Sequence, residues 1–377
     1  MPFSVERVEN RHQRRCFIEL PFRLYRDDPY WVPPVRHLQM EIFDKRKHPF
    51  HHHADVNFYL ARDDKGQVRG RIASILNHAH NDYHGERTGF FGFLETENDQ
   101  ELAQVLLETC RRDLAEAGMD RVRGPMNFST NEECGLLVKG FDGSPLIMMP
   151  YNPPWYMDLL TGCGYAKVKD LFAYKLYSAL AVKSRMARVA ELVRRRSNAV
   201  LRDISVRRIH QEVPLIMDIY NECWRDNWGF VPMTKMELDR MADELRMILV
   251  PSMAPILEVD GRPVAFAVSM MDANQAFIRA GGSLVKAILA LKVPFFRVRM
   301  DRSRVLLLGV SKDYRGRGFE ALLIDRIISS NVEQGVEWGE LSWILEDNVS
   351  MRRILERDLK AEQYRTYRIY EKEIVRH

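Results

Sequence analysis

Apolar and polar residues follow two periods along this chain, and the two periods alternate from end to end. Short apolar or alternating runs bounded by turn residues predict strands, and apolar residues three and four positions apart predict helices. In the first half the predicted strands are Phe3–Glu9, Val56–Arg62, Val68–Leu76, Thr88–Glu95, Arg121–Pro125 and Leu171–Tyr177, and the predicted helices are Arg11–Arg26, Val35–Phe43 and Asp99–Ala117. This mixture predicts an α/β fold built on a mixed sheet.

The second half of the chain repeats this order of elements. Its predicted strands are Leu201–Ile209, Ala254–Val259, Val264–Met270, Arg304–Val310, Trp338–Glu346 and Tyr364–Glu371, and its predicted helices are Val213–Asp226, Thr234–Leu249, Phe319–Gln334 and Val349–Leu359. Asp260-Gly261 predicts a hairpin turn, and the strongly apolar Arg304–Val310 predicts a central strand. Element order alone therefore predicts two copies of one fold, residues 1–178 and 200–377, joined by a basic helix over 179–199.

Composition is that of a globular protein with local positive patches. The chain is 46% apolar and 29% charged, which is ordinary for a folded domain. The net charge is only +4, yet residues 183–208 hold nine basic and two acidic side chains, and residues 279–304 hold seven basic and one acidic. Such patches attract CoA phosphates, lipid headgroups or nucleic acid, although two solvated helix faces would have the same composition.

Cysteine usage and hydropathy predict the compartment. The five cysteines are scattered, odd in number and lack a CxxC pair, which indicates reduced thiols. No apolar run approaches the ~20 residues of a spanning helix, and the N-terminus lacks the apolar core of a signal peptide. We therefore expect a cytoplasmic protein, with peripheral contact to the inner face of the membrane as the alternative.

The most informative stretch joins the strand Arg304–Val310 to the helix that begins near Phe319. Its loop, Ser311–Arg317, is basic and carries glycine. The first NH groups of a helix have no internal partner and lie at its positive end, so they suit a phosphate. Gly316 and Gly318 let the backbone approach such a ligand without a Cβ. Three cations add charge: Lys312, Arg315 and Arg317. An ordinary surface loop is the alternative.

This loop resembles the pyrophosphate loop of the GNAT superfamily of acyl-CoA N-acyltransferases, whose pattern is Arg/Gln-x-x-Gly-x-Gly/Ala. The stretch 315–320 matches the first five positions, and Glu320 replaces the small residue at the sixth. The resemblance covers residues 201–377 and implies two tandem GNAT-like domains, the first degenerate and on the acceptor side. It implies cofactor contacts from Leu308, Val310, Lys312, Arg315, Gly316, Arg317, Gly318, Phe319 and Asn348.

Three further stretches narrow the resemblance to a bacterial subgroup. They are Gly124–Gly135, Met148–Tyr156 and Asn227–Pro232. Some members of that subgroup resemble the bacterial N-acyltransferases that make ceramide-type lipids. The resemblance implies acyl-CoA or acetyl-CoA as donor, a small-molecule or lipid amine as acceptor, and no metal.

Amine acylation needs a neutral nitrogen, a polarised thioester carbonyl and a proton donor for the thiolate. In the superfamily a backbone NH of the splayed central strand binds the carbonyl, which here points to 308–310. An Asn often follows the next strand, as Asn348 does, and a Tyr often follows seven residues later, where this chain has Leu355. Our catalytic candidates are Glu346, Asn348, Asn131 and Glu132. Further candidates, for which structural roles are the simpler alternative, are Glu340, Asp347, Glu237, Tyr364, Tyr367 and Tyr370.

The stretch Gly281–Phe296 is unusually apolar for its position before the predicted cofactor strand. Leu284, Ile288 and Leu291 share one helical face. Lys286, Lys292, Arg297 and Arg299 flank them. A short apolar helix with a basic fringe can lie in a membrane interface. It could equally line a pocket for a long acyl chain, or pack on the domain core.

Other functions leave weaker signals in the sequence. His78, His80 and His84 could ligate a metal, but only Asp82 accompanies them, so we favour a solvated loop. The arginines 194–196, 207 and 208 could contact nucleic acid, but the aromatic stacking pattern of an RNA-binding module is missing, which disfavours such a partner. A small-amine acetyltransferase and an inactive CoA-binding protein stay open as alternatives.

Overall fold

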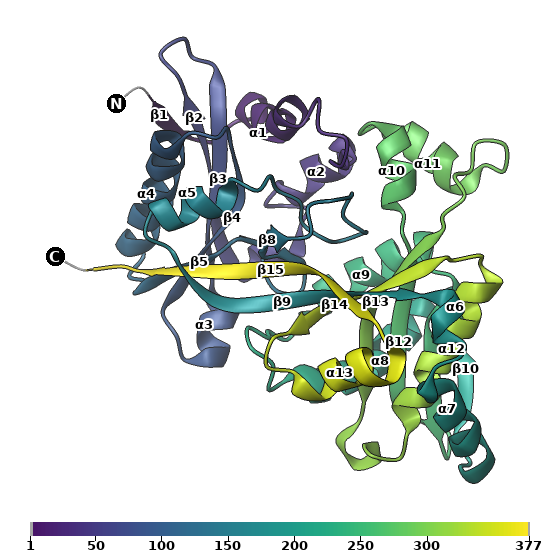
Figure 1. The fold of residues 1–377 in the computed structure, drawn as a ribbon. Coiled ribbons are helices and arrows are strands. Elements are labelled where there is room, and N and C mark those ends of the chain that lie inside the picture. Colours follow the sequence, from purple (N-terminus) through teal and green to yellow (C-terminus); the bar gives the residue numbers. More distant parts are fainter. Residues whose placement is uncertain (1–2, 376–377) are drawn as a thin grey trace. The chain divides into compact units, whose positions relative to one another are not determined.

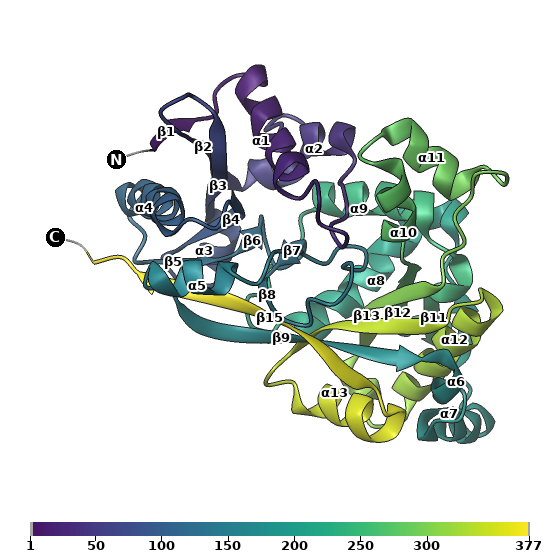
Figure 2. The same cartoon turned by 45° about the horizontal axis from the view of Figure 1, so that its top comes forward.

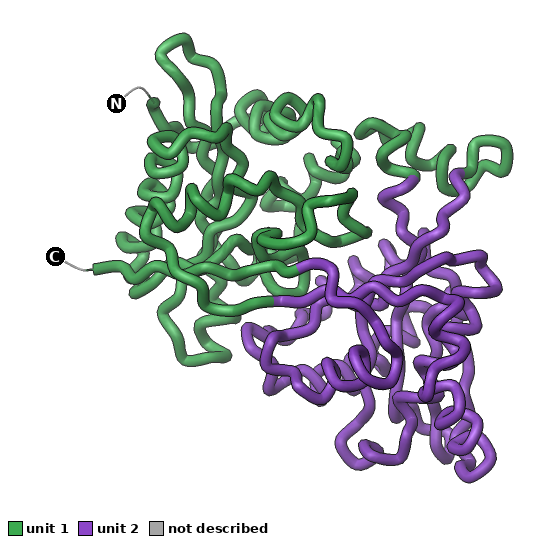
Figure 3. Tube along the Cα trace, in the orientation of Figure 1, with its two compact units in different colours: residues 1–170, 276–297, 366–377 green, residues 171–275, 298–365 purple. Residues whose placement is uncertain are grey.

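The computed structural model describes residues 3–375, and the chain divides into two compact units. Unit 1 comprises residues 1–170, 276–297 and 366–377, and unit 2 comprises residues 171–275 and 298–365 (Figure 3). The two units do not coincide with the predicted ranges 1–178 and 200–377, because segments 276–297 and 366–377 belong to unit 1. The predicted ranges describe a duplication of the fold. A division into compact units does not test that duplication, so these ranges stay a prediction.

The sheet of unit 1 has strand order β1-β2-β3-β4-β5-β15. Only β4 and β5 run parallel in this sheet, and the other neighbours are antiparallel. Its strands are β1 (Ser4–Arg7), β2 (Ala54–Arg62), β3 (Val68–Asn77), β4 (Thr88–Thr96), β5 (Arg121–Gly124) and β15 (Glu362–Glu373), and β8 (Leu136–Lys139) pairs with β15 as well. The helices of this unit are α1 (Arg11–Leu24), α2 (Arg36–Ile42), α3 (His78–His84), α4 (Gln100–Glu116), α5 (Tyr156–Gly162), most of α10 (Asn274–Ala280) and α11 (Leu284–Lys292) (Figure 1).

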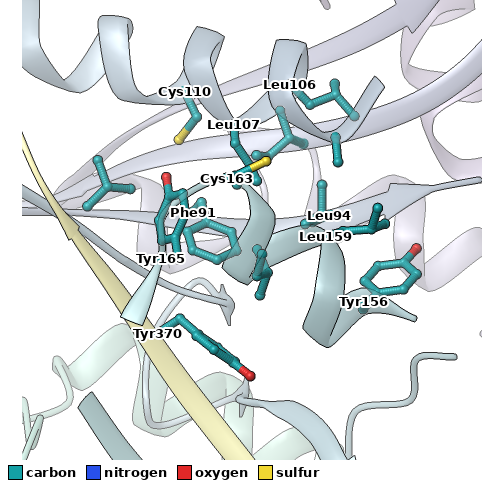
Figure 4. Packing of buried hydrophobic residues seen from close by; sticks show 14 of the residues in the cluster. Phe91, Leu94, Leu106, Leu107, Cys110, Tyr156, Leu159, Cys163, Tyr165 and Tyr370 are labelled. Atoms are coloured by element: carbon teal, nitrogen blue, oxygen red, sulfur yellow. The ribbon is translucent and has the colours of Figure 1, made fainter. Parts of the chain in front are cut away.

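The core of unit 1 forms where α4 covers the sheet. Asp99 caps this helix by accepting a bond from the Leu102 backbone NH at 3.0 Å, which satisfies one NH that the helix itself cannot pair. Apolar residues at helical spacing then face the strands, as periodicity predicts. Figure 4 shows this cluster, which includes Phe91, Leu94, Leu106, Leu107, Cys110, Tyr156, Leu159, Cys163, Tyr165 and Tyr370.

The sheet of unit 2 has strand order β9-β14-β13-β12-β11-β10. Its strands are β9 (Ala166–Tyr177), β10 (Val200–Asp203), β11 (Pro255–Val259), β12 (Arg262–Met271), β13 (Arg302–Val310) and β14 (Trp338–Leu345) (Figure 1 and Figure 2). Only β13 and β14 run parallel in this sheet. Strand β13 is paired on both sides, so its predicted central position is confirmed. The hairpin is confirmed as well, with positive φ angles at Asp260 and Gly261.

Several predicted elements of unit 2 needed correction. The predicted connecting helix 179–199 is two helices, α6 (Ser178–Ala181) and α7 (Arg185–Arg196), and α7 packs on α12 (Phe319–Glu333) through Met186 and Ala190. The predicted strand Leu201–Ile209 ends at Asp203. The predicted helix Val349–Leu359 is α13 (Val349–Arg353) followed by a short π-helix (Ile354–Leu359). The remaining helices, α8 (Ile209–Trp224) and α9 (Lys235–Ile248), match the prediction within four residues.

Candidate active site

The site begins where two parallel strands separate. Strands β13 and β14 pair over four residues, from Arg302 opposite Trp338 to Val305 opposite Leu341. Both strands then continue, β13 to Val310 and β14 to Leu345. Beyond Val305, β13 stays paired with β12 on one side. Because its ladder with β14 stops, the backbone groups on its other side face a gap instead of a neighbouring strand.

A cavity of about 800 Å³ fills this gap. Its size is that of an ordinary small-molecule site. Polar residues lie toward the loop and the strand ends, and they include Asp226, Asn227, Arg315, Glu320, Asp347, Asn348 and Ser350. Apolar residues make up the other part, and they include Leu176, Ala181, Ile324, Ile327, Ile328, Leu341, Ile354, Leu355 and Leu359. The cavity therefore offers both polar and apolar surface to the same ligand, and Ser178, Asn331 and Ser342 add polar groups elsewhere in its lining.

One face of α12 supplies a wall along the cavity. Glu320, Ile324, Ile328 and Asn331 follow one another at helical spacing, and all of them line the cavity. At a rise of 1.5 Å per residue, the stripe from Glu320 to Asn331 is about 16 Å long. Glu320, which replaces the small residue at the sixth position of the superfamily's pattern, thus lines the cavity.

The two glycines of the loop have different surroundings. Both have positive φ, +74° at Gly316 and +79° at Gly318. A Cβ at Gly316 would meet no atom within 4 Å, and this residue lines the cavity. A Cβ at Gly318 would lie 2.7 Å from Cγ2 of Val193 on α7. Gly316 is therefore the glycine that leaves space for a ligand, while Gly318 allows α7 to pack against the start of α12.

The three cations of the loop also differ in their placement. Arg315 lines the cavity, and its Nε donates to the Val310 carbonyl at 3.2 Å. Arg317 donates to the Asp313 carbonyl at 3.1 Å and stacks over Tyr314. Lys312 and Arg317 are not among the residues that line the cavity, and neither are Gly318 and Phe319. Leu308, Val310, Arg315, Gly316 and Asn348 are the predicted cofactor residues that do line it.

The end of β14 brings a second polar group to the cavity. Asn348 caps α13, and its side chain accepts a bond from the Met351 NH at 3.1 Å. The neighbouring Asp347 lines the cavity too, whereas Glu346 does not. The Glu346 carbonyl accepts a bond from Arg352 at 3.0 Å. Leu355, which stands where the superfamily often has Tyr, is buried against the apolar part of the cavity.

Glu340 lies in a buried polar network beside the separating strands. Its carboxylate is fully buried and accepts bonds from the Ser342 hydroxyl at 2.6 Å and from the Tyr364 hydroxyl. Arg304 lies 3.7 Å from the same carboxylate and donates to Ser342 at 2.8 Å. Since both carboxylate oxygens have partners, the geometry favours a structural role for Glu340 in holding β14 where it leaves β13.

The remaining candidate residues have structural surroundings. Glu237 completes a capping box with Thr234 at the start of α9. Tyr367 is fully buried, and Tyr370 belongs to the core of unit 1. Asn131 and Glu132 lie in a loop of unit 1, where Glu132 is 4.0 Å from His48. Their predicted role toward the acceptor stays a prediction.

Sequence reasoning missed several residues of the cavity. Cys223 and Trp224 at the end of α8, and Asn227 and Trp228 just after it, form part of the wall. The Cys223 thiol donates to the Val310 carbonyl at 3.3 Å, and burial raises the pKa of this thiol. The stretch Asn227–Pro232, which resembles the bacterial subgroup, is the signal in the sequence that points to this part of the wall.

Unit 1 holds a buried carboxyl group that the sequence did not indicate. Glu95 accepts bonds from the hydroxyls of Tyr25 and Tyr156, the latter at 3.1 Å, and Arg71 lies 3.6 Å away. Burial raises the pKa of Glu95. Tyr156 comes from the noted stretch Met148–Tyr156, so part of that stretch serves the core of unit 1.

The histidines have local partners instead of a shared centre. The predicted loop around them is the helix α3, in which His80 is buried and His78 lies 2.8 Å from Asp55. Within residues 3–375, no group of three or more His, Cys, Asp or Glu side chains is arranged to hold a metal ion. Over the same residues, no helix combines the length and the apolar character needed to cross a membrane.

Comparison with known proteins identifies two curated relatives. No family model matches the chain. The chain is 33% identical to Protein YghO of Escherichia coli K12, over 97% of this chain and 94% of that protein. It is 32% identical to the bacterial ceramide synthase of Caulobacter vibrioides, over 98% of this chain and 97% of that protein.

Solved structures show the same fold at low identity. A tandem GNAT protein from the clavulanic acid biosynthesis pathway aligns with a TM-score of 0.59 at 10% identity, covering 100% of this chain and 99% of that one. A GCN5-related N-acetyltransferase from Sphaerobacter thermophilus aligns with a TM-score of 0.54 at 12% identity, covering 99% and 96%. Fold and curated relatives together support acyl transfer as the general activity. The chain has the fold of tandem GNAT proteins, and it belongs to the family that contains Protein YghO and the bacterial ceramide synthase.

Proposed function

We propose that this protein transfers a long acyl group from acyl-CoA to the amine of a lipid. The observation that carries the proposal is the cavity of about 800 Å³ between β13 and β14, which has the Gly316 loop at its polar end and an apolar floor. The loop would take the pyrophosphate of the donor. The gap between the strands would take the thioester arm.

The polar end suits a phosphate for physical reasons. Gly316 leaves open space there, and α12 begins three residues later with unpaired NH groups and its positive end. Arg315 adds a fixed positive charge, held by its bond to the Val310 carbonyl. Glu320 opposes these groups, so the donor must approach from the Gly316 side of the loop.

The reaction needs three functions from this chain. The amine nitrogen attacks the thioester carbon, and the developing oxyanion accepts a hydrogen bond from a backbone NH of β13 at Leu308 or Val310. The amine must lose a proton, and the thiolate of CoA must gain one when the C–S bond breaks. Asn348 and Glu346 remain our candidates for these catalytic roles at the end of β14. Asp347, between them, is a carboxylate that lines the cavity. Leu355 cannot donate a proton, so the donor is another group.

Two observations support a long acyl chain and a lipid acceptor. Ile324, Ile327 and Ile328 of α12 line the cavity beyond Glu320, and a two-carbon acetyl group would leave much of this apolar wall uncovered. The Caulobacter relative is named a ceramide synthase, and a ceramide is a long-chain amino alcohol acylated on nitrogen. Burial of an acyl chain in an apolar channel stabilises the complex by about 0.8 kcal/mol for each methylene.

The first test compares ligands by thermal shift. A ligand that binds only the folded state raises the melting temperature by mass action. We expect palmitoyl-CoA, used below its micelle range, to stabilise the protein more than CoA or acetyl-CoA does. Equal shifts for CoA and acetyl-CoA without one for palmitoyl-CoA would favour a small-amine acetyltransferase. No shift with any of them would contradict CoA binding at this loop.

A matched pair of variants tests the loop itself. Gly316→Asn and Gly316→Asp have nearly the same size, and both residues tolerate the left-handed region that Gly316 adopts at φ +74°. Only Asp adds a negative charge where the pyrophosphate would lie. Repulsion of unit charges about 4 Å apart is roughly 1 kcal/mol in water and more in a partly buried site. The Asp variant should therefore bind CoA at least about fivefold more weakly than the Asn variant, and salt should shrink the difference.

A further inference from the structure

Segment 276–297 of unit 1 turns its large apolar side chains outward. It contains the end of α10 (Asn274–Ala280) and all of α11 (Leu284–Lys292). The buried residues of these helices are small: Ala276, Ala280, Ala287 and Ala290. The exposed ones are large: Ile278, Leu284, Val285, Ile288, Phe295 and Phe296. A helix that only packed on a core would have the opposite orientation.

Two phenylalanines form the most exposed part of this surface. Phe295 is 90% exposed and Phe296 is 55% exposed, and their rings meet edge to face at 5.2 Å. Single exposed apolar residues are common on proteins, but a contiguous group marks a surface that meets something apolar.

The charge around this surface has a single sign. The segment contains no Asp or Glu, and the exposed cations Arg279, Lys286, Lys292 and Arg297 surround the apolar side chains. Among residues 3–375, no carboxylate forms an ion pair with any of these four. Their charge therefore remains available to an anionic partner.

The segment is firmly seated on unit 1. The Arg36 backbone NH donates to the Gly282 carbonyl at 3.1 Å, and its guanidinium donates to the Gly281 carbonyl at 3.0 Å. The same guanidinium lies over the Phe22 ring, and Val35 packs against Ala280 and Ala287. The outward orientation of the large side chains is thus fixed by contacts on the inner side.

We propose that segment 276–297 docks the protein on an anionic membrane surface. Phe295, Phe296 and the outer face of α11 would enter the boundary between headgroups and acyl chains, and the cations would meet lipid phosphates. The interior of an anionic bilayer is apolar and its headgroup surface is negatively charged. Such a bilayer therefore complements both the exposed apolar side chains and the cations of this segment. Such docking goes beyond the proposed reaction, and it would bring the enzyme to the phase in which long-chain lipids partition.

Co-sedimentation of the full chain with vesicles tests the proposal without any acyl-CoA, so it is independent of the proposed reaction. We expect binding to phosphatidylcholine mixed with phosphatidylglycerol, and much weaker binding to phosphatidylcholine alone. Removing one surface cation lowers partitioning about fivefold, so Lys286→Gln with Lys292→Gln should lower it about 25-fold. Phe295→Ser with Phe296→Ser should lower it at least about tenfold, even at a salt concentration that suppresses the charge effect.

The matched control lies on α9. Met236 and Met247 are 55% and 57% exposed, and their helix carries four acidic and three basic side chains rather than cations alone, so Met236→Ser with Met247→Ser should leave vesicle binding unchanged. All variants should keep the wild-type melting temperature, because each changed side chain is exposed. The proposal is overturned if the wild type ignores anionic vesicles, if the control loses binding equally, or if the phenylalanine variant converts a dimer to a monomer without affecting vesicle binding.

Discussion

Replacing Ile328 by Phe should shorten the apolar part of the cavity. Ile328 lies on the stripe of α12 that lines the cavity, three residues before Asn331 at the far end. A larger ring at this position would fill the space beyond it. Ile328→Met keeps the volume nearly constant and serves as the control, since such exchanges are well tolerated in packed interiors.

The expected loss follows from the length of helix beyond Ile328. Three residues at 1.5 Å each leave about 4.5 Å of channel, which holds about three methylenes of an extended chain built from C–C bonds of about 1.5 Å. At about 0.8 kcal/mol for each methylene, the loss is about 2.4 kcal/mol, or roughly 60-fold in affinity.

Equilibrium binding of acyl-CoAs measures this effect without knowledge of the acceptor. Titration calorimetry with acetyl-CoA, octanoyl-CoA and palmitoyl-CoA should show the loss for palmitoyl-CoA alone, because shorter chains end before Ile328. The Met variant should follow the wild type throughout. Equal losses for all three donors would mean that the Phe variant distorts the whole site, and equal affinities would mean that the acyl chain lies elsewhere; either result refutes the assignment of the channel.

Three further predictions concern stability. Glu340→Gln leaves the buried Arg304 near a neutral amide and should lower the free energy of unfolding by about 3 kcal/mol; a denaturant midpoint close to wild type would contradict the network. Burial lowers the pKa of His80 to about 4 from 6.5, so the folded state resists protonation and stability falls as pH drops between these values, by up to about 3 kcal/mol. A His80→Leu variant should show a flatter pH profile of the unfolding midpoint. A Cβ at Gly92 would overlap a backbone carbonyl, whereas Gly66 has open space, so Gly92→Ala should disrupt unit 1 by circular dichroism and Gly66→Ala should cost only about 1 kcal/mol.

The sequence by itself determined the elements and the chemistry of the loop. Hydrophobic periodicity located the central strand β13, the helix α12 and the hairpin at Asp260-Gly261, because these features depend on residues near one another in the chain. The Arg-Gly-Arg-Gly pattern after β13 indicated an anion site for the same reason. Periodicity was least reliable at 179–199, where Ser184 caps a second helix and splits the predicted one.

Only the tertiary structure decided which of these residues share a site. The separation of β13 from β14 depends on sheet pairing, and the wall from Trp224 and Trp228 comes from a segment about 80 residues earlier in the chain. Two glycines with the same backbone conformation differ because α7 packs beside one of them. The face of α11 that points outward was likewise undetermined, since a helical stripe of apolar residues looks the same whether it meets a core or water. The periodicity of side chains along a helix or strand determines which residues share a face. Only packing between distant segments determines what that face contacts.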